Sequence, residues 1–171
     1  KNHIYSKEME HDACGVGLIA STEGKKSRQV VKYGIEALKA VWHRGAVDAD
    51  GKTGDGAGIH VEIPKDFFIE KVEVTGHTYD DCEICVGMIF LPRNDYDAQE
   101  SCKTIVESEL TKNNFNIFGW RQVPVNPKVL GVKAFQTMPE IIQVLFKSND
   151  QNLLNKKLER KIYETRRKIE N

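Results

Sequence analysis

Apolar residues recur at helical spacing in several stretches of this chain, and short strand-like runs lie between them. The clearest stripe is Val31, Ile35, Leu38 and Trp42, at spacings of four, three and four. Such spacing places the four side chains on one face of a helix. Ser27 precedes the stripe and is a good N-cap residue. We therefore expect a helix after Ser27 whose apolar face belongs to the core.

The remaining periodic segments predict a mixed fold. Further helices are expected at residues 66–74, 96–112, 139–146 and 153–169. Phe67 and Phe68 should point inward from the first of these. The inner side of the second is expected to be Ala98, Cys102, Ile105, Val106 and Leu110. Strands are expected at residues 15–21, 57–63, 84–91 and 114–121. This order is that of an α+β fold built in layers, and 171 residues suffice for one domain.

The charge balance excludes some classes of partner. The chain has 25 basic and 25 acidic residues, so no net charge draws it toward nucleic acid or an anionic membrane. No apolar run approaches the ~20 residues of a spanning helix, and the first 13 residues lack the apolar region of a signal peptide. We expect a soluble, cytoplasmic protein that binds neither nucleic acid nor membrane.

The predicted C-terminal helix is the one strongly basic segment. Its apolar stripe is expected to be Leu154, Leu158, Ile162 and Ile169. A basic amphipathic helix can bind a membrane surface or nucleic acid. Here Glu159, Glu164 and Glu170 interrupt the charge, and Tyr163 is the only aromatic residue that could stack on a base. The pattern favours a solvated face.

The four cysteines are Cys14, Cys82, Cys85 and Cys102. Without a secretory signal they are expected to be free thiols rather than disulfides. Cys82 and Cys85 have the CxxC spacing of a zinc half-site, but a structural zinc ion needs a second pair of ligands. We predict no metal site.

Cys14 lies between small residues at the start of an apolar run, His11–Ala20. Gly15 and Gly17 have no Cβ, so a ligand or another backbone can approach the thiol closely. Local chemistry leaves two interpretations open. Cys14 is a nucleophile, or it is a small apolar residue buried at the start of a strand.

Arg44 follows the first predicted helix, and Gly45 suits the left-handed residue that ends a helix. The arginine is either a solvated cation at a helix C-terminus or a planar fork that binds a carboxylate through two hydrogen bonds. A glycine-rich loop with Lys52 and Thr53 follows. It is not a phosphate-binding loop, because the GxxxxGK[ST] order and its preceding strand are absent.

Several motifs together resemble one family. The runs EHDACGVG, HRGAVDADGKTGDGAGI, VGMIFLPR and GWRQVPVN resemble, in this order, the amino-terminal glutaminase domain of glutamate synthase large subunits. That domain is a class II glutamine amidotransferase of the N-terminal-nucleophile (Ntn) hydrolase type. The resemblance covers the whole chain. It implies a four-layer αββα sandwich, incomplete in this chain.

The resemblance also implies the site. Cys14 would be the nucleophile that hydrolyses L-glutamine to glutamate and ammonia through a thioester, and Arg44 would hold the substrate α-carboxylate. The Cys residue becomes the first residue of the mature enzyme in this family. Ala13–Cys14 would then be the scissile bond, residues 1–13 a propeptide remnant, and residues 14–171 the N-terminal part of the amidotransferase domain.

The chain lacks two sequence motifs of the family. The RYSTNT and NGE motifs, which supply the oxyanion hole and the rest of the glutamine pocket, do not occur in it. We therefore expect an amino-terminal fragment that is inactive alone and binds no cofactor. The resemblance places FMN and a 3Fe-4S cluster in the synthase domain of the full enzyme. That domain aminates 2-oxoglutarate, in some members with a small NADPH-oxidising subunit.

Two other hypotheses remain open. The chain could belong to another class II amidotransferase with a different ammonia acceptor. It could also be a non-catalytic folded module in which Cys14 only packs.

Overall fold

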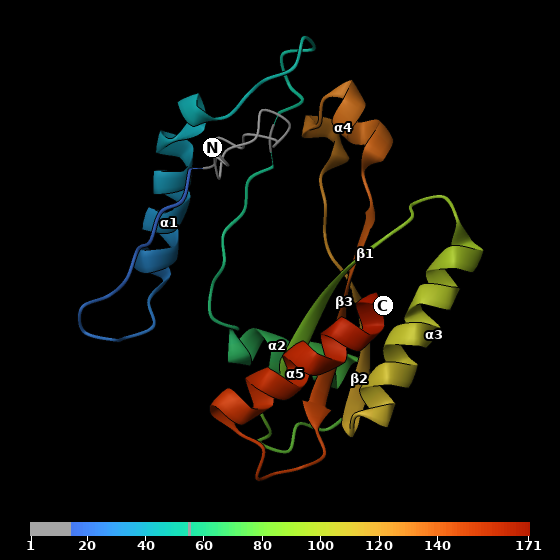
Figure 1. Cartoon of the computed structure of the whole chain (residues 1–171). Coiled ribbons are helices and arrows are strands. Elements are labelled where there is room, and N and C mark those ends of the chain that lie inside the picture. The colour runs from blue at the N-terminus through green and yellow to red at the C-terminus, as the bar shows by residue number, and fades with distance from the viewer. Residues whose placement is uncertain (1–14, 55) are drawn as a thin grey trace, which may run out of the picture. The chain divides into compact units, whose positions relative to one another are not determined.

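The computed structural model describes residues 15–54 and 56–171, and the chain divides into two compact units (Figure 1). The first unit comprises Lys1–Glu62 and Pro127–Gln136. The second comprises Ile63–Asn126 and Thr137–Asn171. The first unit is therefore discontinuous: the connection between two strands of the second unit contributes a segment to it.

An antiparallel three-stranded sheet forms the centre of the second unit. Its strands are β1 (Cys85–Leu91), β2 (Phe115–Gln122) and β3 (Glu140–Ser148), in the order β1-β3-β2. Cys85 pairs with Phe146 on one side of β3, and Phe115 pairs with Ser148 on the other. The two outer strands confirm the sequence predictions to within one residue.

The central strand corrects a prediction. Residues 139–146 were expected to form a helix, yet they run through β3, where Ile142 to Phe146 are all buried. A central strand covered on both faces carries a continuous apolar run with no alternation. Such a run cannot be distinguished from a buried helix by periodicity.

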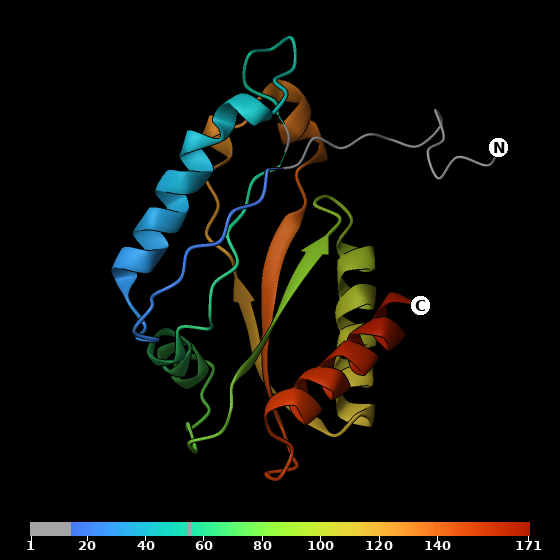
Figure 2. The same cartoon turned by 60° about the vertical axis from the view of Figure 1, so that its left-hand side comes forward.

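Helices α3 (Tyr96–Lys112) and α5 (Asn155–Glu170) cover one face of the sheet (Figure 2). Their Val106, Leu110 and Leu158 pack with strand residues in one cluster: Cys85, Phe115, Val144 and Phe146. The bounds of α3 agree with the sequence prediction. Ile105, expected on its inner side, is instead half exposed.

The opposite face of the sheet meets α2 (Lys65–Val74). Phe68 and Val72 of this helix pack with Ile84, Phe118 and Leu145. Val144 and Leu145 thus point into different clusters, as neighbours on a strand must. Phe68 is buried as expected, whereas Phe67 remains 38% exposed and packs edge-on against it.

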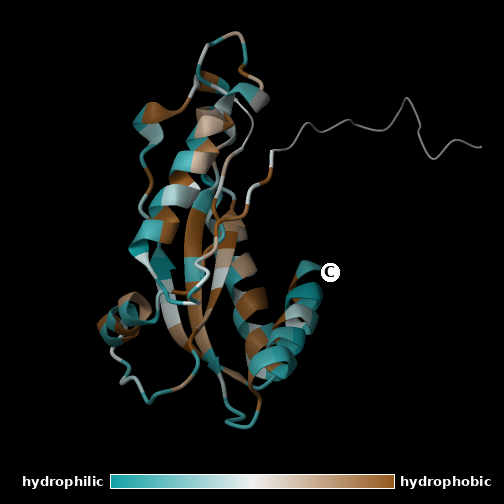
Figure 3. Cartoon of the chain, turned by 90° about the vertical axis from the view of Figure 1, so that its left-hand side faces the viewer, coloured by the Kyte–Doolittle hydropathy of each residue, from teal (hydrophilic) through white to brown (hydrophobic). Residues whose placement is uncertain are grey.

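The outer surface of α5 is hydrophilic (Figure 3). Its arginines pair with glutamates of the same helix: Arg160 with Glu164, and Arg166 and Arg167 with Glu170. This pairing supports the interpretation of a solvated face. Leu154, expected in the apolar stripe, precedes the helix and is 52% exposed. Across the residues described, no helix has the length and apolar character needed to cross a membrane.

The first unit contains α1 (Arg28–Ala40), the 3-10 turns η1 (Trp42–Arg44) and η2 (Pro127–Val129), and most of α4 (Val132–Thr137). Ser27 caps α1 as predicted, since its hydroxyl accepts a hydrogen bond from the Gln29 N–H at 3.1 Å. The predicted apolar face is only half-buried, and α1 has no buried residue. Trp42 lies beyond the helix and is 75% exposed.

Two predicted strands of the first unit are wrong. Residues 15–21 and 57–63 have no strand structure, and Val16 and Leu18 are 95% and 89% exposed. The only strand-like pairing in the described part of this unit is an isolated bridge between Val47 and Gly54. An alternating sequence becomes a strand only when its backbone groups find a partner strand. Gly45 is extended, with φ −85°, and not left-handed as expected.

Candidate functional site

The predicted catalytic and processing residues, Cys14 and Ala13, lie outside the described residues. Arg44 is described through its main chain only. The structure therefore locates one end of the predicted site, the segment around Arg44, together with the loop that follows it. It does not test whether Cys14 and Arg44 come together.

The Trp42–Gly45 segment is a tight turn after α1. The helix closes at Val41, whose N–H donates to the Ala37 carbonyl at 3.3 Å. Residues Trp42–Arg44 then form η1, and the Gly45 N–H donates to the Trp42 carbonyl at 3.0 Å. The side chains of Trp42 and His43 are exposed. The glycine-rich loop follows this turn directly.

The loop from Ala46 to Gly54 is closed by its own backbone. The Asp48 N–H donates to the Thr53 carbonyl at 2.7 Å, and the Gly51 N–H donates to the Asp48 carbonyl at 2.9 Å. A Cβ on Gly54 would lie 2.8 Å from the Ala46 carbonyl oxygen. Only glycine permits so close an approach at this position. The two ends of the loop are therefore held against each other next to Arg44.

Asp50 is the hydrogen-bonding centre of this loop. Its Oδ1 accepts from the N–H groups of Lys52 and Thr53 at 2.9 and 2.7 Å. Its Oδ2 accepts from the Thr53 hydroxyl at 2.6 Å and from the Val132 N–H at 3.0 Å. These bonds, led by that from the Thr53 side chain, hold the pKa of the Asp50 carboxyl far below its ordinary value.

Two further contacts join the loop to the 131–133 segment. Lys133 Nζ lies 2.6 Å from Asp48 Oδ2. Gly131 is buried, and a Cβ at this position would collide with Asp50 and Thr53. We call Asp50, Thr53, Gly131 and Val132 the Asp50 clamp. Sequence reasoning missed it. One half of the clamp has a local signal in the sequence, because an Asp often binds the N–H groups two and three residues further on, as Asp50 does. The contact with Val132 has no such local signal.

The clamp also explains why this loop is no phosphate site. A phosphate-binding loop directs its free backbone N–H groups at the anion. Here the N–H groups of Lys52 and Thr53 already bind the Asp50 carboxylate. The loop is occupied by an acidic side chain of its own.

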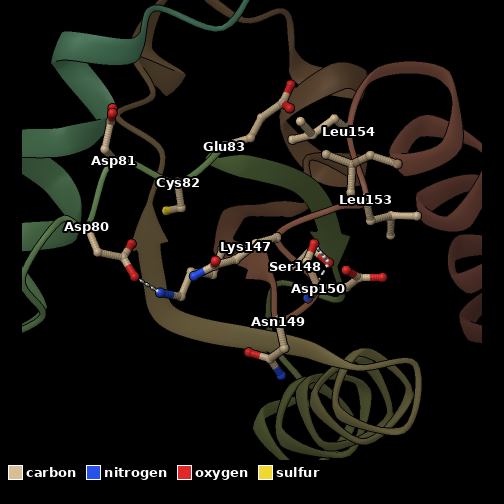
Figure 4. Close-up of a pocket in the computed structure, with 12 residues that line it drawn as sticks. Asp80, Asp81, Cys82, Glu83, Lys147, Ser148, Asn149, Asp150, Leu153 and Leu154 are labelled. Carbon is tan, nitrogen blue, oxygen red and sulfur yellow. Dashed lines mark hydrogen bonds and ion pairs between the residues drawn. The ribbon is translucent and has the colours of Figure 1, made fainter.

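A cavity of ≈510 Å³ in the second unit is the other candidate site (Figure 4). Asp80 pairs with Lys147 at its wall, beside Cys82. Burial, and then a hydrogen bond to Asp80, raise the pKa of the Cys82 thiol to about 11. The thiol is therefore protonated at neutral pH and is a poor nucleophile. This cavity does not support cysteine-based catalysis.

The neighbouring Cys85 is still less reactive. It is buried in β1, and burial raises the pKa of its thiol to about 12. Cys82, Cys85 and Cys102 are all free thiols. Within residues 15–54 and 56–171, no group of three or more His, Cys, Asp or Glu side chains could hold a metal ion.

Comparison with known sequences shows the family to which the chain belongs. The family model of the class-II glutamine amidotransferases matches residues 14–171. The chain is 55% identical, over 98% of its length, to the glutamate synthase [NADPH] large chain of Azospirillum brasilense. It is 40% identical over 94% of its length to ferredoxin-dependent glutamate synthase 1, chloroplastic/mitochondrial, of Arabidopsis thaliana. It is 34% identical over 98% to the glutamate synthase [NADPH] large chain of Bacillus subtilis.

These relatives are far longer than the chain. The chain spans 11% of the Azospirillum and Bacillus proteins and 10% of the Arabidopsis protein. The similarity therefore concerns one part of each relative. The relatives include both NADPH and ferredoxin types, so similarity does not select an electron donor.

Proposed function

Because the chain belongs to the class-II glutamine amidotransferases, we propose that it forms the amino-terminal part of the glutaminase domain of a glutamate synthase large chain. The observation that carries the proposal is the 55% identity to such a large chain over 98% of these residues. The whole protein would take the amide nitrogen of L-glutamine and transfer it, as ammonia, to 2-oxoglutarate. This chain would supply the nucleophile and the α-carboxylate contact.

Cys14 is the proposed nucleophile. Its α-amine, once free, accepts the thiol proton directly or through a water, so one residue provides both nucleophile and base. The thiolate attacks the side-chain amide carbon of glutamine, and the C–N bond breaks with release of ammonia. Water then hydrolyses the thioester to glutamate and restores the thiol. The oxyanion donors for this reaction are assigned to parts of the protein other than this chain.

Maturation at Ala13–Cys14 is part of the same proposal. An α-amine base requires that Cys14 be the first residue, so residues 1–13 would be removed. The family match supports this division, because it begins at residue 14. Residues 14–171 would then be the N-terminal part of the amidotransferase domain.

Arg44 is the proposed ligand of the substrate α-carboxylate. Its guanidinium can donate two parallel hydrogen bonds to a carboxylate, and the charge makes both of them strong. The exposure of its neighbours Trp42, His43 and Gly45 supports this role, because a substrate can reach this part of the turn.

We further propose that the second unit is half of the four-layer αββα sandwich of Ntn hydrolases. Helices α3 and α5 cover one face of its sheet. On the opposite face, α2 packs over Phe118, Leu145 and Val86, but Met88 and Phe90 of β1 remain 49% and 64% exposed. A second sheet packed there would bury these two side chains, and the remaining part of the domain would supply it.

FMN and a 3Fe-4S cluster are assigned to the synthase domain of the whole protein. The described residues fit neither a cluster nor another metal, since Cys85 is buried and no group of three or more ligand side chains occurs among them. No step of the glutaminase reaction passes through these cofactors. An NADPH-oxidising small subunit is a proposed partner of the whole protein.

The test is glutamine hydrolysis by the full-length protein. Glutamate and ammonia should form from L-glutamine, and mass analysis should find Cys14 as the first residue. Cys14→Ala should abolish the glutamine-dependent reaction while ammonia-dependent glutamate formation continues. Cys102→Ala is the matched control, since this half-buried thiol is not assigned to the site.

Three outcomes would contradict the proposal. Active enzyme that retains Ala13 would exclude the α-amine as base. Glutamine hydrolysis coupled to an acceptor other than 2-oxoglutarate would point to a different class II amidotransferase. A full-length protein without glutamine-dependent activity would leave a non-catalytic module.

A further inference from the structure

The Asp50 clamp lies immediately after the proposed glutamine-binding turn, and nothing in the reaction uses it directly. We propose that Asp50 is a positioning residue for glutamine binding, which fixes the loop after Arg44 to the Gly131–Val132 segment. The inference rests on the proposed function, because it takes Arg44 as the ligand of the substrate α-carboxylate.

The connection from Arg44 to the clamp is short and tight. The Gly45 N–H bonds back to Trp42, so the chain leaves η1 in a defined direction. Gly54 then presses against Ala46, and the bridge between Val47 and Gly54 closes the base of the loop. No flexible linker separates Arg44 from this base. A change in the loop therefore moves the Arg44 main chain.

Asp50 is what fixes the loop to a distant part of the chain. Its Oδ2 accepts from the Val132 N–H, which lies 82 residues further along. The same carboxylate binds both backbone and side chain of Thr53, and the absence of a side chain at Gly131 lets the two segments meet. Bonds that a charged acceptor makes to N–H groups are stronger than neutral ones.

A carboxylate is required at this position, because four donors converge on its two oxygens. Asparagine has the same shape but only one acceptor oxygen. If that oxygen faces Lys52 and Thr53, the amide NH₂ points at the Val132 N–H. If the amide is flipped, the NH₂ points at the N–H groups of Lys52 and Thr53 instead. In either orientation at least one N–H loses its acceptor in the loop and must bind water instead, so the loop is held less firmly to the Gly131–Val132 segment.

The experiment compares Asp50→Asn with the wild type in the full-length, mature protein. The kcat/KM for glutamine should fall by several-fold to about 10-fold, because the bonds that are lost are exposed to solvent, and most of the fall should be in KM. The kcat with saturating ammonia should be unchanged, because ammonia bypasses the glutaminase site. This split between substrates would not arise from general destabilisation.

Labelling of Cys14 gives a second readout. A glutamine analogue with a diazoketone in place of the amide should need a higher concentration for half-maximal labelling of the variant, with the same limiting rate. Iodoacetamide, which has no α-carboxylate, should label both proteins equally. Together these results would locate the defect in recognition of the amino acid and not in the thiol.

Three variants sharpen the comparison. Gly131→Ala disturbs the clamp from its other side and should show the same split. Asp50→Glu keeps the charge and should restore part of the glutamine affinity. Asp97→Asn, in the first turn of α3 in the second unit, is the matched control and should leave both activities unchanged.

The inference is overturned if Asp50→Asn and Gly131→Ala leave the glutamine KM unchanged while the wild type hydrolyses glutamine. It is also overturned if glutamine- and ammonia-dependent activities fall together, since the clamp would then only stabilise the fold. A wild type that uses ammonia but not glutamine would overturn the proposed function itself, and the inference with it.

Discussion

The two units of this chain are stabilised in different ways. Every buried hydrophobic side chain among the described residues belongs to the second unit, around the β1-β3-β2 sheet. In the described part of the first unit, α1 presents only a half-buried apolar face, and the loop after it is held by the Asp50 clamp. Burial therefore stabilises the second unit, whereas directional polar contacts shape the region next to Arg44.

This difference bears on the proposed function. Apolar packing is non-directional, whereas the energy of a hydrogen bond depends on distance and angle. If the turn presents the Arg44 guanidinium to the substrate, as we propose, it needs fixed geometry more than it needs bulk stability. The predictions below test this division from the largest expected effect to the smallest.

Truncation in the core should give the largest effect. Leu145 is fully buried between the sheet and α2, so Leu145→Ala should destabilise the second unit by about 2–5 kcal/mol. Leu38→Ala removes the same atoms from the half-buried face of α1 and should cost well under half as much. Native-state hydrogen exchange of the β3 and α1 amides measures both free energies. Equal costs would show that α1 is packed as tightly as the sheet.

The rate of thiol alkylation should also differ strongly between the two units. With pKa values of about 11 and 12, Cys82 and Cys85 hold little thiolate at pH 8. Their alkylation by iodoacetamide should be about 100-fold or more slower than that of Cys14, the proposed activated nucleophile. Because burial raises these two pKa values, their labelling should keep rising with pH up to about 11 for Cys82 and about 12 for Cys85. Equal labelling at pH 8 would contradict the assignment of Cys14.

Arg44→Lys should have an intermediate effect. Lysine keeps the charge but cannot make two parallel bonds, so glutamine use should weaken by roughly 1.5–3 kcal/mol for each bond lost. Ammonia-dependent glutamate formation should survive, and the melting temperature should hardly change. Steady-state kinetics with the two nitrogen donors measures the difference. Unchanged glutamine kinetics would return Arg44 to the role of a helix-terminal cation.

Removing the helix N-caps should give the smallest effect, and its cost should be nearly the same in the two units. Ser27 caps α1 and Asp95 caps α3, each through a side-chain oxygen that accepts from a backbone N–H. Replacing either by alanine removes about 1 kcal/mol of helix stability. For Asp95 the loss should appear as a lower melting temperature of the packed unit, and for Ser27 as faster exchange confined to the first turn of α1. A global loss from Ser27→Ala would show that α1 and the sheet unfold together.

Much of the second unit could be predicted from local pattern. The amphipathic period of residues 96–112 gave both ends of α3, and the runs before and after it gave β1 and β2 within a residue. The Ser27 cap was equally local. Each of these signals needs only neighbours in sequence, because helix capping and helix faces are determined within a few turns.

The errors share one cause. The apolar run at residues 139–146 forms the central strand, whereas the apolar run at 15–21 and the alternating run at 57–63 form no strand among the described residues. Whether an apolar run becomes a strand depends on which other segments offer backbone partners and cover its faces. That choice is made across the chain, so periodicity alone does not contain it.

The candidate site divides in the same way. The sequence alone determined the family, and the motifs around Cys14 and Arg44 predict a nucleophile and a carboxylate ligand. Only the tertiary structure revealed Asp50, because its proposed role depends on the Val132 N–H, 82 residues away, and on the missing side chain of Gly131. A reactive group can be recognised from its own chemistry, but the contacts that hold it in place come from segments that meet only when the chain folds.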